Sequence, residues 1–419
     1  MKHRILIISH AHPAFSKGGA EIASYNLHKE FHRREDCTSL YLARRGDEIS
    51  GHHATEFSSV GQNEILFRSQ IEHFVFSNNR PDTITRDFRQ LLEDYTPTII
   101  HFHHYTHLGL EMIREVKNWN KEVPIILTLH EYLAICDNFG QMVTTQGRLC
   151  NESSPVRCAV CKPSRSAPEF FFRERFIKSF FALVDHFISP SQFLIDRYVA
   201  WGLPVEKIAL LENGLPNEIV LADGDTQLSE DYVPFRFGYF GQINPFKGLD
   251  VLLEAVTLLP KAVRKLIRVE VHGSGLENQA HDFQSKIQNL LEKNRKTVKY
   301  FGAYEPQDVH GLMRGVDWVI VPSIWWENSP LVIQEAFAVR RPLIVSNIGG
   351  MAEKVKDGVS GYHFRNRNAA DLARVMENAL NKEMYRVLQG QLPKPVGCRQ
   401  SVEAHIDCYD KTKSLLVTR

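Results

Sequence analysis

The chain has 419 residues, too many for one ordinary hydrophobic core, so two or three domains are expected. Its composition, 43% hydrophobic and 24% charged, is that of a globular protein. Fifty basic and forty-nine acidic residues leave a net charge of +1, which excludes a global field that attracts nucleic acid. No apolar run is long enough to span a bilayer, and the N-terminal run is too short for a signal peptide. We therefore expect a soluble, cytoplasmic protein.

The first half of the chain alternates short apolar runs with longer amphipathic segments. The runs are rich in β-branched residues, which is typical of strands buried on both faces of a parallel sheet. Segments such as "GAEIASYNLHKEFHRR" between them have the apolar spacing of helices. The pattern predicts the βαβ units of a doubly wound domain. The expected strands cover 4–9, 38–43, 98–103, 124–130, 186–191 and 207–213.

The same pattern returns after a segment of turn residues and acids at 214–234, which we interpret as a linker. Parallel α/β sheets bind ligands at the carboxyl ends of their strands. We therefore predict an α/β chain with two Rossmann-like, doubly wound parallel-sheet domains that face each other across a cleft. The expected strands of the second half cover 235–241, 267–273, 298–302, 318–323, 342–347 and 361–364.

The stretch "GGAE" follows the first expected strand and begins an expected helix. The paired glycines Gly18 and Gly19 let the backbone approach a ligand, and a helix N-terminus offers free N–H groups to an anion. Most such pairs are plain turns, so the stretch is weak by itself. No G-x-G-x-x-G follows the first strand, which excludes a dinucleotide fingerprint there.

The corresponding turn of the second half reads "GQINPFKG". Lys247 stands just before an amphipathic helix, where it can neutralise a phosphate together with the helix dipole. The alternative is a solvated lysine beside a capping glycine, Gly248. A third glycine turn, "HGSG", follows the next strand and is equally weak alone.

Two glutamates flank the turn "ENSP" and the helix after it. Glu327 lies past the end of an expected strand, and Pro330 is suited to the first turn of the helix. Glu335, next to Ala336 and Phe337, is expected to face inward, where its carboxylate needs a hydrogen-bonding partner. The two adjacent hydroxyls of a ribose are one natural partner for two acceptor oxygens. Together with free helix N–H groups and a nearby lysine, these carboxylates indicate a nucleotide-sugar site.

In their order and spacing, these stretches make the chain resemble a retaining glycosyltransferase of family 4, with the GT-B architecture. Each match is modest, but together they extend over almost the whole chain. They are "GGAE" at 18–21, "TLHEY" at 128–132, "ISPSQF" at 188–193, "LENG" at 211–214, "GQINPFKG" at 241–248, "HGSG" at 272–275, E-x7-E at 327–335 and "GGMAEKVKDGVSGYHF" at 349–364.

The resemblance implies a domain plan and an activity. The N-terminal domain, 1–215, binds the acceptor and carries a Cys-rich insertion at 136–161. The C-terminal domain, 216–395, binds the nucleotide sugar, and a last helix, 396–419, packs back on the N-terminal domain. The activity is transfer of a sugar, with retention, from a nucleotide diphosphate sugar to a glycan or lipid-linked acceptor, in bacterial cell-surface polysaccharide synthesis. Transfer needs no cofactor.

The resemblance also implies residue roles. Glu335 holds the ribose hydroxyls, Glu327 lies near the transferred sugar, and Lys247 meets the diphosphate. His130 contacts the donor sugar and steadies positive charge at the reacting carbon. With no dedicated nucleophile, the leaving phosphate helps deprotonate the acceptor, so electrostatic stabilisation of that group is the main catalytic contribution. The other donor-binding residues implied are Gly18, Gly19, Gln242, Gly275, Ser329, Leu331 and Val332.

The sequence departs from the family's pattern at two positions. Gln242 stands where relatives usually have an arginine, so one of two positive charges expected on the diphosphate is missing. Another cation replaces it, or the site relies more on backbone N–H groups. Glu131 follows His130 where many relatives have aspartate, and no role is assigned to it.

Four cysteines crowd the segment after His130. Two of them form a C-x-x-C pair, and the set can hold a structural zinc ion in tetrahedral geometry. Similar insertions occur in many members of the family. The alternatives are buried thiols or a redox pair. The four are Cys136, Cys150, Cys158 and Cys161.

Two further stretches have open interpretations. The segment 169–187 mixes phenylalanine with arginine and lysine, so it can lie peripherally on the inner face of the plasma membrane or be an ordinary half-buried helix. In "HFHHYTH" (101–107), His101 and His103 share one strand face and His104 the other. A cleft-lining or acceptor-side role is favoured over a metal there, because no carboxylates stand alongside.

Two other functions remain alternatives to a transferase. A nucleotide-sugar 2-epimerase has this architecture but differs in the E-x7-E region. A non-catalytic sugar-nucleotide-binding partner agrees with the missing arginine, but not with the retained Lys247, Glu327, Glu335 and His130. The donor base, donor sugar and acceptor cannot be deduced from these residues, because sugar selectivity depends on a few pocket hydrogen bonds.

Overall fold

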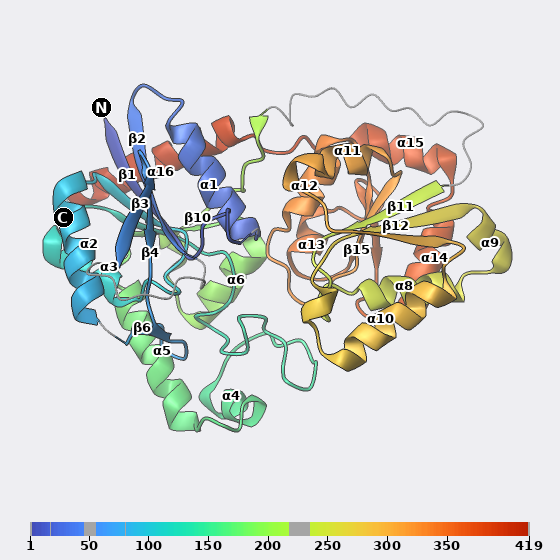
Figure 1. Ribbon diagram of the computed structural model, residues 1–419, viewed down its shortest axis with the longest axis horizontal. Helices are drawn as coiled ribbons and strands as arrows, with labels where there is room; N and C mark the ends of the chain where they lie inside the picture. Colours follow the sequence, from blue (N-terminus) through green and yellow to red (C-terminus); the bar gives the residue numbers. More distant parts are fainter. Residues whose placement is uncertain (1, 17, 46–55, 80, 218–234, 418–419) are drawn as a thin grey trace. The chain divides into compact units, whose positions relative to one another are not determined.

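A computed structural model describes residues 2–16, 18–45, 56–79, 81–217 and 235–417 of the chain (Figure 1). The chain divides into two compact units. The first comprises Met1–Gly214 and Gly397–Arg419, and the second comprises Leu215–Val396. These limits lie within one residue of the expected 215/216 and 395/396 divisions. Most of the expected linker, 218–234, lies outside the described residues.

The first unit is built on a sheet with the strand order β10-β9-β8-β7-β1-β2-β4-β3. All neighbouring pairs are parallel except β3 with β4. A two-stranded hairpin, β5 with β6, stands apart from it. The strands are β1 His3–Ser9, β2 Cys37–Arg44, β3 Phe57–Gly61, β4 Glu64–Phe67, β5 Ile71–Glu72, β6 Ser77–Asn78, β7 Ile99–Phe102, β8 Ile125–Thr128, β9 His186–Ser189 and β10 Ile208–Leu210.

Helices cover this sheet, and the C-terminal helix α16 is one of them. Figure 1 shows α16, at the red end of the colour scale, beside α1. Val402, Ile406 and Tyr409 of α16 belong to the same hydrophobic core as Ile5 and Ile7 of β1. The helices are α1 Gly19–Phe31, α2 Pro81–Tyr95, α3 Glu111–Trp119, α4 Pro155–Cys161, α5 Ala167–Phe181, α6 Gln192–Trp201 and α16 Cys398–Val417.

The second unit is built on a fully parallel sheet with the order β13-β12-β11-β14-β15-β16. Successive residues of its strands enter two separate cores. Tyr239, Ile320 and Ile344 lie in one, and Phe240 and Val319 lie in the other. Both faces of the sheet are therefore buried under helices, as expected for strands that read as continuous apolar runs.

The elements of the second unit follow one another as strand and helix almost throughout. The strands are β11 Phe235–Phe240, β12 Ile267–His272, β13 Val298–Gly302, β14 Trp318–Val321, β15 Leu343–Ser346 and β16 Gly361–Phe364. The helices are α8 Leu249–Leu258, α9 Lys261–Lys265, α10 His281–Lys293, α11 Val309–Arg314, α12 Leu331–Ala338, α13 Gly349–Lys354, α14 Ala369–Asn378 and α15 Lys382–Gln391.

The prediction of two doubly wound α/β units is confirmed, and each of the twelve expected strands corresponds to one in the structure. The strands β3 to β6 were not predicted. They are two to five residues long; β3 is mostly exposed, β5 and β6 have two residues each, and the apolar run of β4 is only three residues long. No helix in the described part of the chain combines the length and the apolar character needed to cross a bilayer.

Candidate functional site

The candidate site of the second unit lies where its strand order reverses. From β11 the chain proceeds outward to β12 and β13, and then returns to place β14 on the other side of β11. The carboxyl ends of β11 and β14 therefore form the topological switch point, where open α/β sheets bind ligands. Lys247 lies in the loop after β11, and Glu327 lies in the loop after β14.

An ion pair joins these two loops, because Lys247 Nζ lies 2.7 Å from Glu327 Oε1. The same oxygen accepts hydrogen bonds from Ser323 Oγ and Trp325 Nε1, each at 2.8 Å. The Glu327 side chain is buried, whereas that of Lys247 is 28% exposed. A buried carboxylate requires such partners. The three donors fix Glu327 in one position and hold the Lys247 ammonium group beside it.

Backbone contacts hold the two loops together. Ile324 N donates to Phe246 O at 2.8 Å. Gly248, the N-cap of α8, has φ +70°, and a Cβ there would lie 2.0 Å from Pro322 O. A side chain at this position would therefore separate the loops. Gly248 therefore lets the loop that carries Lys247 pack directly on the loop after β14.

The remaining glycine turns of this edge pack on one another. A Cβ on Gly273 would lie 2.0 Å from Gly241 O, so the loops after β11 and β12 are in backbone contact. Gly275 has φ +96°, in the left-handed region. Gln242 is exposed, and its carbonyl accepts a hydrogen bond from Tyr239 Oη at 2.7 Å. The Gln242 side chain therefore stands at the open surface of this edge.

The helix α12 starts within the loop that carries Glu327. Pro330 is its N-cap and provides no side-chain cap, so the helix begins one residue later than a proline in the first turn implies. Its first N–H groups have no partner within the helix, as at every helix N-terminus. Leu331 and Val332 at this end are half-buried, as is Ser329 just before them.

Two glycines of α13 lock the backbone of this loop. Gly350 N donates to Glu327 O at 2.8 Å. A Cβ on Gly350 would lie 1.5 Å from Asn328 O, which no side chain tolerates. Gly349 has φ +57°, a left-handed conformation. The "GG" at 349–350 therefore lets α13 touch the segment that carries the candidate carboxylate.

Glu335 differs from Glu327 in having no protein partner. The residues that the structure describes provide neither a hydrogen bond nor an ion pair to its half-buried carboxylate. Burial raises the pKa of Glu335 to about 7. A carboxylate in this state can accept hydrogen bonds from a ligand, which agrees with its predicted inward orientation and leaves its role to the ligand.

In the first unit, the residues singled out from the sequence also lie at a switch point, between β1 and β7. Gly18 is the N-cap of α1, and a Cβ there would lie 2.4 Å from Glu21 Oε2; Gly19 is exposed. Glu21 Oε1 lies 3.3 Å from His10 Nε2. Burial by itself raises the pKa of Glu21, but the contact with His10 outweighs it and brings the pKa to about 2. Gly18 and Gly19 therefore lie beside the ionised, buried carboxylate of Glu21.

His130 follows β8 at the same edge of this sheet and is half-buried. Burial lowers its pKa to about 3, so its ring is neutral. Next to it, Glu131 Oε1 lies 3.2 Å from His104 Nε2, and burial raises the pKa of Glu131 to about 8. No role was predicted for Glu131, and no carboxylate was expected beside the histidine-rich stretch. The structure places Glu131, which follows β8, beside His104.

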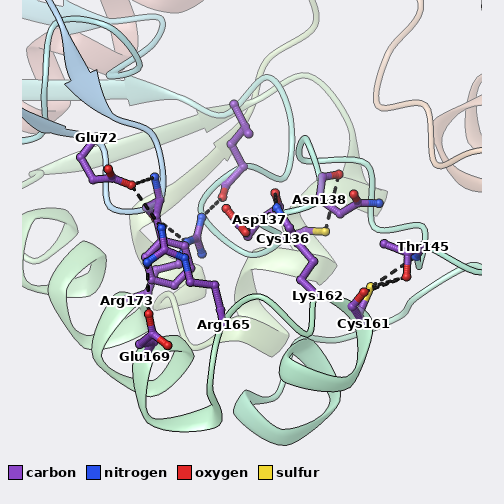
Figure 2. A network of polar contacts seen from close by, with 12 residues as sticks. Glu72, Cys136, Asp137, Asn138, Thr145, Cys161, Lys162, Arg165, Glu169 and Arg173 are labelled. Atoms are coloured by element: carbon purple, nitrogen blue, oxygen red, sulfur yellow. Dashed lines mark hydrogen bonds and ion pairs between the residues drawn. The ribbon is translucent and has the colours of Figure 1, made fainter. Parts of the chain in front are cut away.

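The predicted zinc set is not supported. In the described part of the chain, which includes all four cysteines, no group of three or more His, Cys, Asp or Glu residues is arranged to hold a metal ion. Two of the thiols have different hydrogen-bond partners, because Cys136 Sγ contacts Asn138 O and Cys161 Sγ accepts from Thr145 N (Figure 2). The C-x-x-C spacing fits the seven-residue helix α4, which ends at Cys161.

A buried arginine fastens the segment after His130 instead. Arg173 of α5 is 3% exposed, and its guanidinium donates to Phe74 O at 2.6 Å and Ala134 O at 2.7 Å, and also to Leu133 O (Figure 2). Three carbonyl acceptors satisfy most of its donors. This role could not be predicted from the sequence, because Arg173 is one of several cations in the segment 169–187.

Family comparisons cover most of the chain. The family model described as Glycosyltransferase Family 4 matches residues 17–218, and the one described as Glycosyl transferases group 1 matches residues 227–391. A lipopolysaccharide 1,2-N-acetylglucosaminetransferase of Salmonella typhimurium is 29% identical over 193 residues, which are 44% of this chain and 50% of that protein. A D-inositol 3-phosphate glycosyltransferase of Corynebacterium aurimucosum is 28% identical over 36% of each chain. The chain thus spans half or less of the length of these relatives.

Solved structures resemble the chain over nearly its full length. Anabaena HepE, in complex with UDP and glucose, has a TM-score of 0.66 at 16% identity and covers 98% of this chain and 100% of its own. Sucrose-phosphate synthase from Thermosynechococcus elongatus has a TM-score of 0.70 at 17% identity, with 100% of both chains covered. At such identities the similarity shows the fold, which is GT-B. The chain belongs to the glycosyl transferases group 1 family, as the sequence motifs implied.

Proposed function

We propose that the chain is a retaining glycosyltransferase that moves a sugar from a nucleoside diphosphate donor to a glycan or lipid-linked acceptor. The observation that carries the proposal is the pairing of Lys247 with Glu327 across the switch point of the second unit. The same edge of the sheet presents the N-terminus of α12 and the unpartnered carboxylate of Glu335. These are a cation, free N–H groups and a hydroxyl acceptor, which a ribose linked to a diphosphate requires.

Lys247 has the donors needed to bind two groups at once. An ammonium group carries three N–H donors, and Glu327 takes one of them. The others can reach a phosphate oxygen while the pairing with Glu327 keeps the side chain in place. Because this cation exists before the donor arrives, little reorganisation is needed as negative charge develops on the leaving diphosphate. The first N–H groups of α12, at Leu331 and Val332, contribute in the same way.

The proposed reaction breaks the bond between the anomeric carbon and the diphosphate oxygen. The bond from the acceptor oxygen forms on the same face, and the acceptor proton passes to the leaving diphosphate, so charge and atoms balance. His130, held neutral by burial, acts at the donor sugar as a hydrogen-bonding group. Glu335 holds the ribose. No step is assigned to a metal ion or to a cofactor.

The relatives suggest where substrates should be sought. HepE has been solved with UDP and with UDP-glucose, so uridine diphosphate sugars are the first donors to test. The Salmonella typhimurium relative acts on lipopolysaccharide by its name, which supports an acceptor in bacterial cell-surface polysaccharide synthesis. Neither assignment follows from the geometry of the chain alone.

Peripheral membrane contact at the inner face of the plasma membrane is part of the proposal. The helices α4 and α5 pack together and leave large apolar side chains in solvent. Phe172 of α5 is 67% exposed and Val160 of α4 71%, and Phe139, in the segment before α4, is 79% exposed. Arg175 lies over the Phe171 ring at 5.4 Å, so cations and aromatic rings mix on α5. This combination is typical of surfaces that lie on anionic lipid. The test is co-sedimentation with lipid vesicles. The unmodified chain should sediment with anionic vesicles and Phe172→Ser should not, whereas both should bind neutral vesicles only weakly.

The proposal is tested by a thermal-shift screen against UDP-, GDP-, ADP-, TDP- and CMP-sugars. A ligand that binds only the folded chain raises the free energy of unfolding by mass action, by about 2.7 kcal/mol at a hundredfold excess over Kd, and so raises the Tm. The donor that raises the Tm should then be split slowly by the chain without acceptor, releasing the nucleoside diphosphate. A chain that binds a nucleotide sugar but never releases the diphosphate, with any acceptor extract, would be a binding partner rather than a transferase.

A further inference from the structure

A hydrogen bond joins two histidines that follow neighbouring strands of the first unit. His103 comes directly after β7, and His130 comes two residues after β8. His103 Nδ1 lies 3.0 Å from His130 Nε2. The two rings are stacked, with centroids 5.3 Å apart and planes inclined by 24°. His130 therefore enters the site with one ring nitrogen already occupied by the protein.

The pair can share only one proton along this hydrogen bond. His103 is 3% exposed, and burial lowers its pKa well below the ordinary value, as it lowers that of His130. Both rings are therefore neutral, and a neutral imidazole has one N–H donor and one acceptor nitrogen. If one ring donates in this contact, the other must accept. The contact thus couples the tautomers of the two rings.

A small cavity of mixed polar and apolar lining lies beside His103. Within the described residues, His103 Nε2 is buried and has no hydrogen-bond partner. His103 lines a cavity of about 10 Å³ together with Ser401 and His405 of α16. About this volume is needed to hold one water molecule, and a polar wall is needed to retain it. The cavity places Ser401 and His405 of α16 near the His103 ring.

A second histidine fixes the plane of the His103 ring. The ring centroid of His101, a residue of β7, lies 4.1 Å from that of His103. Its two nitrogens are both used, with Tyr409 Oη at 2.7 Å and Thr128 Oγ1 at 2.7 Å. His101 is thus tied to α16 and to β8, and it limits rotation of His103. The helix α16 supports His103 from two sides, through His101 and through the cavity.

We propose that His103 is a positioning residue that, supported by α16, holds His130 in a single tautomer and orientation. The proposal rests on the proposed role of His130 at the donor sugar. A ring with a fixed tautomer presents a defined donor or acceptor to a sugar hydroxyl, whereas a ring that interconverts presents the correct one for part of the time. His103 touches no substrate in this account and acts only through His130.

The substitution set separates the hydrogen bond from the bulk of the ring. In His103→Asn the amide group occupies the place of Nδ1 and can still bond His130 Nε2. In His103→Leu the volume is similar and the bond is absent. His32→Leu is the control, because His32 is an exposed histidine of the same unit whose bond goes to Ser39 O, at the far end of α1.

The first measurement is the ring-nitrogen NMR spectrum of histidine-labelled chain, in which the His130 signals are those missing from His130→Gln. We expect one neutral tautomer of His130 in the unmodified chain, in His103→Asn and in His32→Leu. In His103→Leu we expect a mixture of the two neutral tautomers. A single His130 tautomer in His103→Leu would overturn the proposal. If that variant does not fold, a tautomer mixture in the unmodified chain or in His103→Asn overturns it equally.

The second measurement is kinetic. In His103→Leu we expect kcat to fall by about 10- to 100-fold, since small misplacement of a catalytic group has effects of this size. KM for the donor should stay within about twofold, and His103→Asn should restore most of kcat. Equal loss of kcat in the two His103 variants would contradict positioning through Nδ1. If the unmodified chain transfers no sugar, the proposed function fails, and the NMR result still decides whether His103 holds His130.

Discussion

Lys247 Nζ and Glu327 Oε1 lie 2.7 Å apart, across the point where the strand order of the second unit reverses. Lys247 and Glu327 are 80 positions apart in the sequence, and the fold brings their side chains into contact. In the proposed function the lysine provides the charge for a diphosphate, and the glutamate orients the lysine. Ser323 and Trp325 in turn orient the glutamate. Replacement of Lys247 in this network has a testable consequence.

Replacement of Lys247 by alanine should remove sugar transfer. The leaving diphosphate then loses its cation, and loss of one such stabilising group costs about 10²- to 10³-fold in kcat. The measurement is the rate of diphosphate release with the best donor of the thermal-shift screen. Lys286→Ala is the matched control, because Lys286 forms a comparable ion pair with Asp250 at 2.6 Å in the same unit. Turnover within a few-fold of the unmodified chain in Lys247→Ala would refute the diphosphate assignment.

Donor binding should depend on pH through Glu335. Its pKa is about 7 in the folded chain against an ordinary value of 4.5, so between these pH values the folded chain binds the extra proton and loses stability as the pH rises. A ribose diol bonds the ionised carboxylate, so donor affinity should increase as the pH rises to about 7 and then level off. Calorimetric titration of a nucleotide sugar from pH 5.5 to 8 measures this.

The control for the pH effect is Glu335→Gln, which keeps the shape and removes the titration. Its donor affinity should be weaker than that of the unmodified chain at pH 8 and independent of pH. A 2′-deoxyribose donor should bind the unmodified chain and the variant about equally. If Glu335→Gln shows the same pH slope as the unmodified chain, another group is responsible and the ribose assignment loses its support.

Gln242→Arg should strengthen nucleoside diphosphate binding. The side chain is exposed at the edge that carries Lys247, where the resemblance to the family implies an arginine. A bidentate guanidinium on a phosphate gains about one to three kcal/mol in favourable geometry, less where solvent screens it. We expect Kd to fall several-fold at low salt and the gain to shrink at high salt. Gln242→Ala should change Kd little. Weaker binding in Gln242→Arg would indicate that backbone N–H groups have taken over the place of that cation.

Gly350→Ala should disrupt the loop that holds Glu327. A Cβ at this position would lie 1.5 Å from Asn328 O, so α13 or the loop must move. We expect the free energy of unfolding to fall by about 2 kcal/mol or more, and donor binding to weaken with it. Gly311→Ala is the control, because Gly311 lies in α11 with no atom within 4 Å of its added Cβ and should be neutral or slightly stabilising. Urea unfolding followed by far-UV circular dichroism measures both. Equal stability of the two variants would contradict the packing argument.

Much of the fold followed from the sequence because parallel strands buried on both faces are nearly continuous apolar runs. The runs at β1 and β14 are examples, with 0% exposure at Ile7 and Val319. The strands β3 to β6 could not be found in this way, because they are short and β3 is mostly exposed. Local pattern predicts an element only where burial imposes that pattern.

The candidate site could be predicted only as far as its residues lie in recognisable turns. Lys247 and Glu335 were found from their positions, but nothing in the sequence shows that Ser323 and Trp325 bond Glu327, because such contacts depend on how two loops fold over each other. The same holds for His103 and Arg173, which looked like a strand-end histidine and a surface cation. Cysteine spacing indicated zinc, which the described residues do not support, since no group among them is arranged to hold a metal ion.

The central claim, that the switch point of the second unit binds a nucleoside diphosphate, is tested most directly by calorimetric titration with UDP, GDP, ADP and TDP. The unmodified chain should bind at least one of them, with affinity about tenfold or more weaker in both Lys247→Ala and Glu335→Gln and unchanged in Lys286→Ala. Absence of binding by all four, or equal affinity in the unmodified chain and the two site variants, would contradict the account.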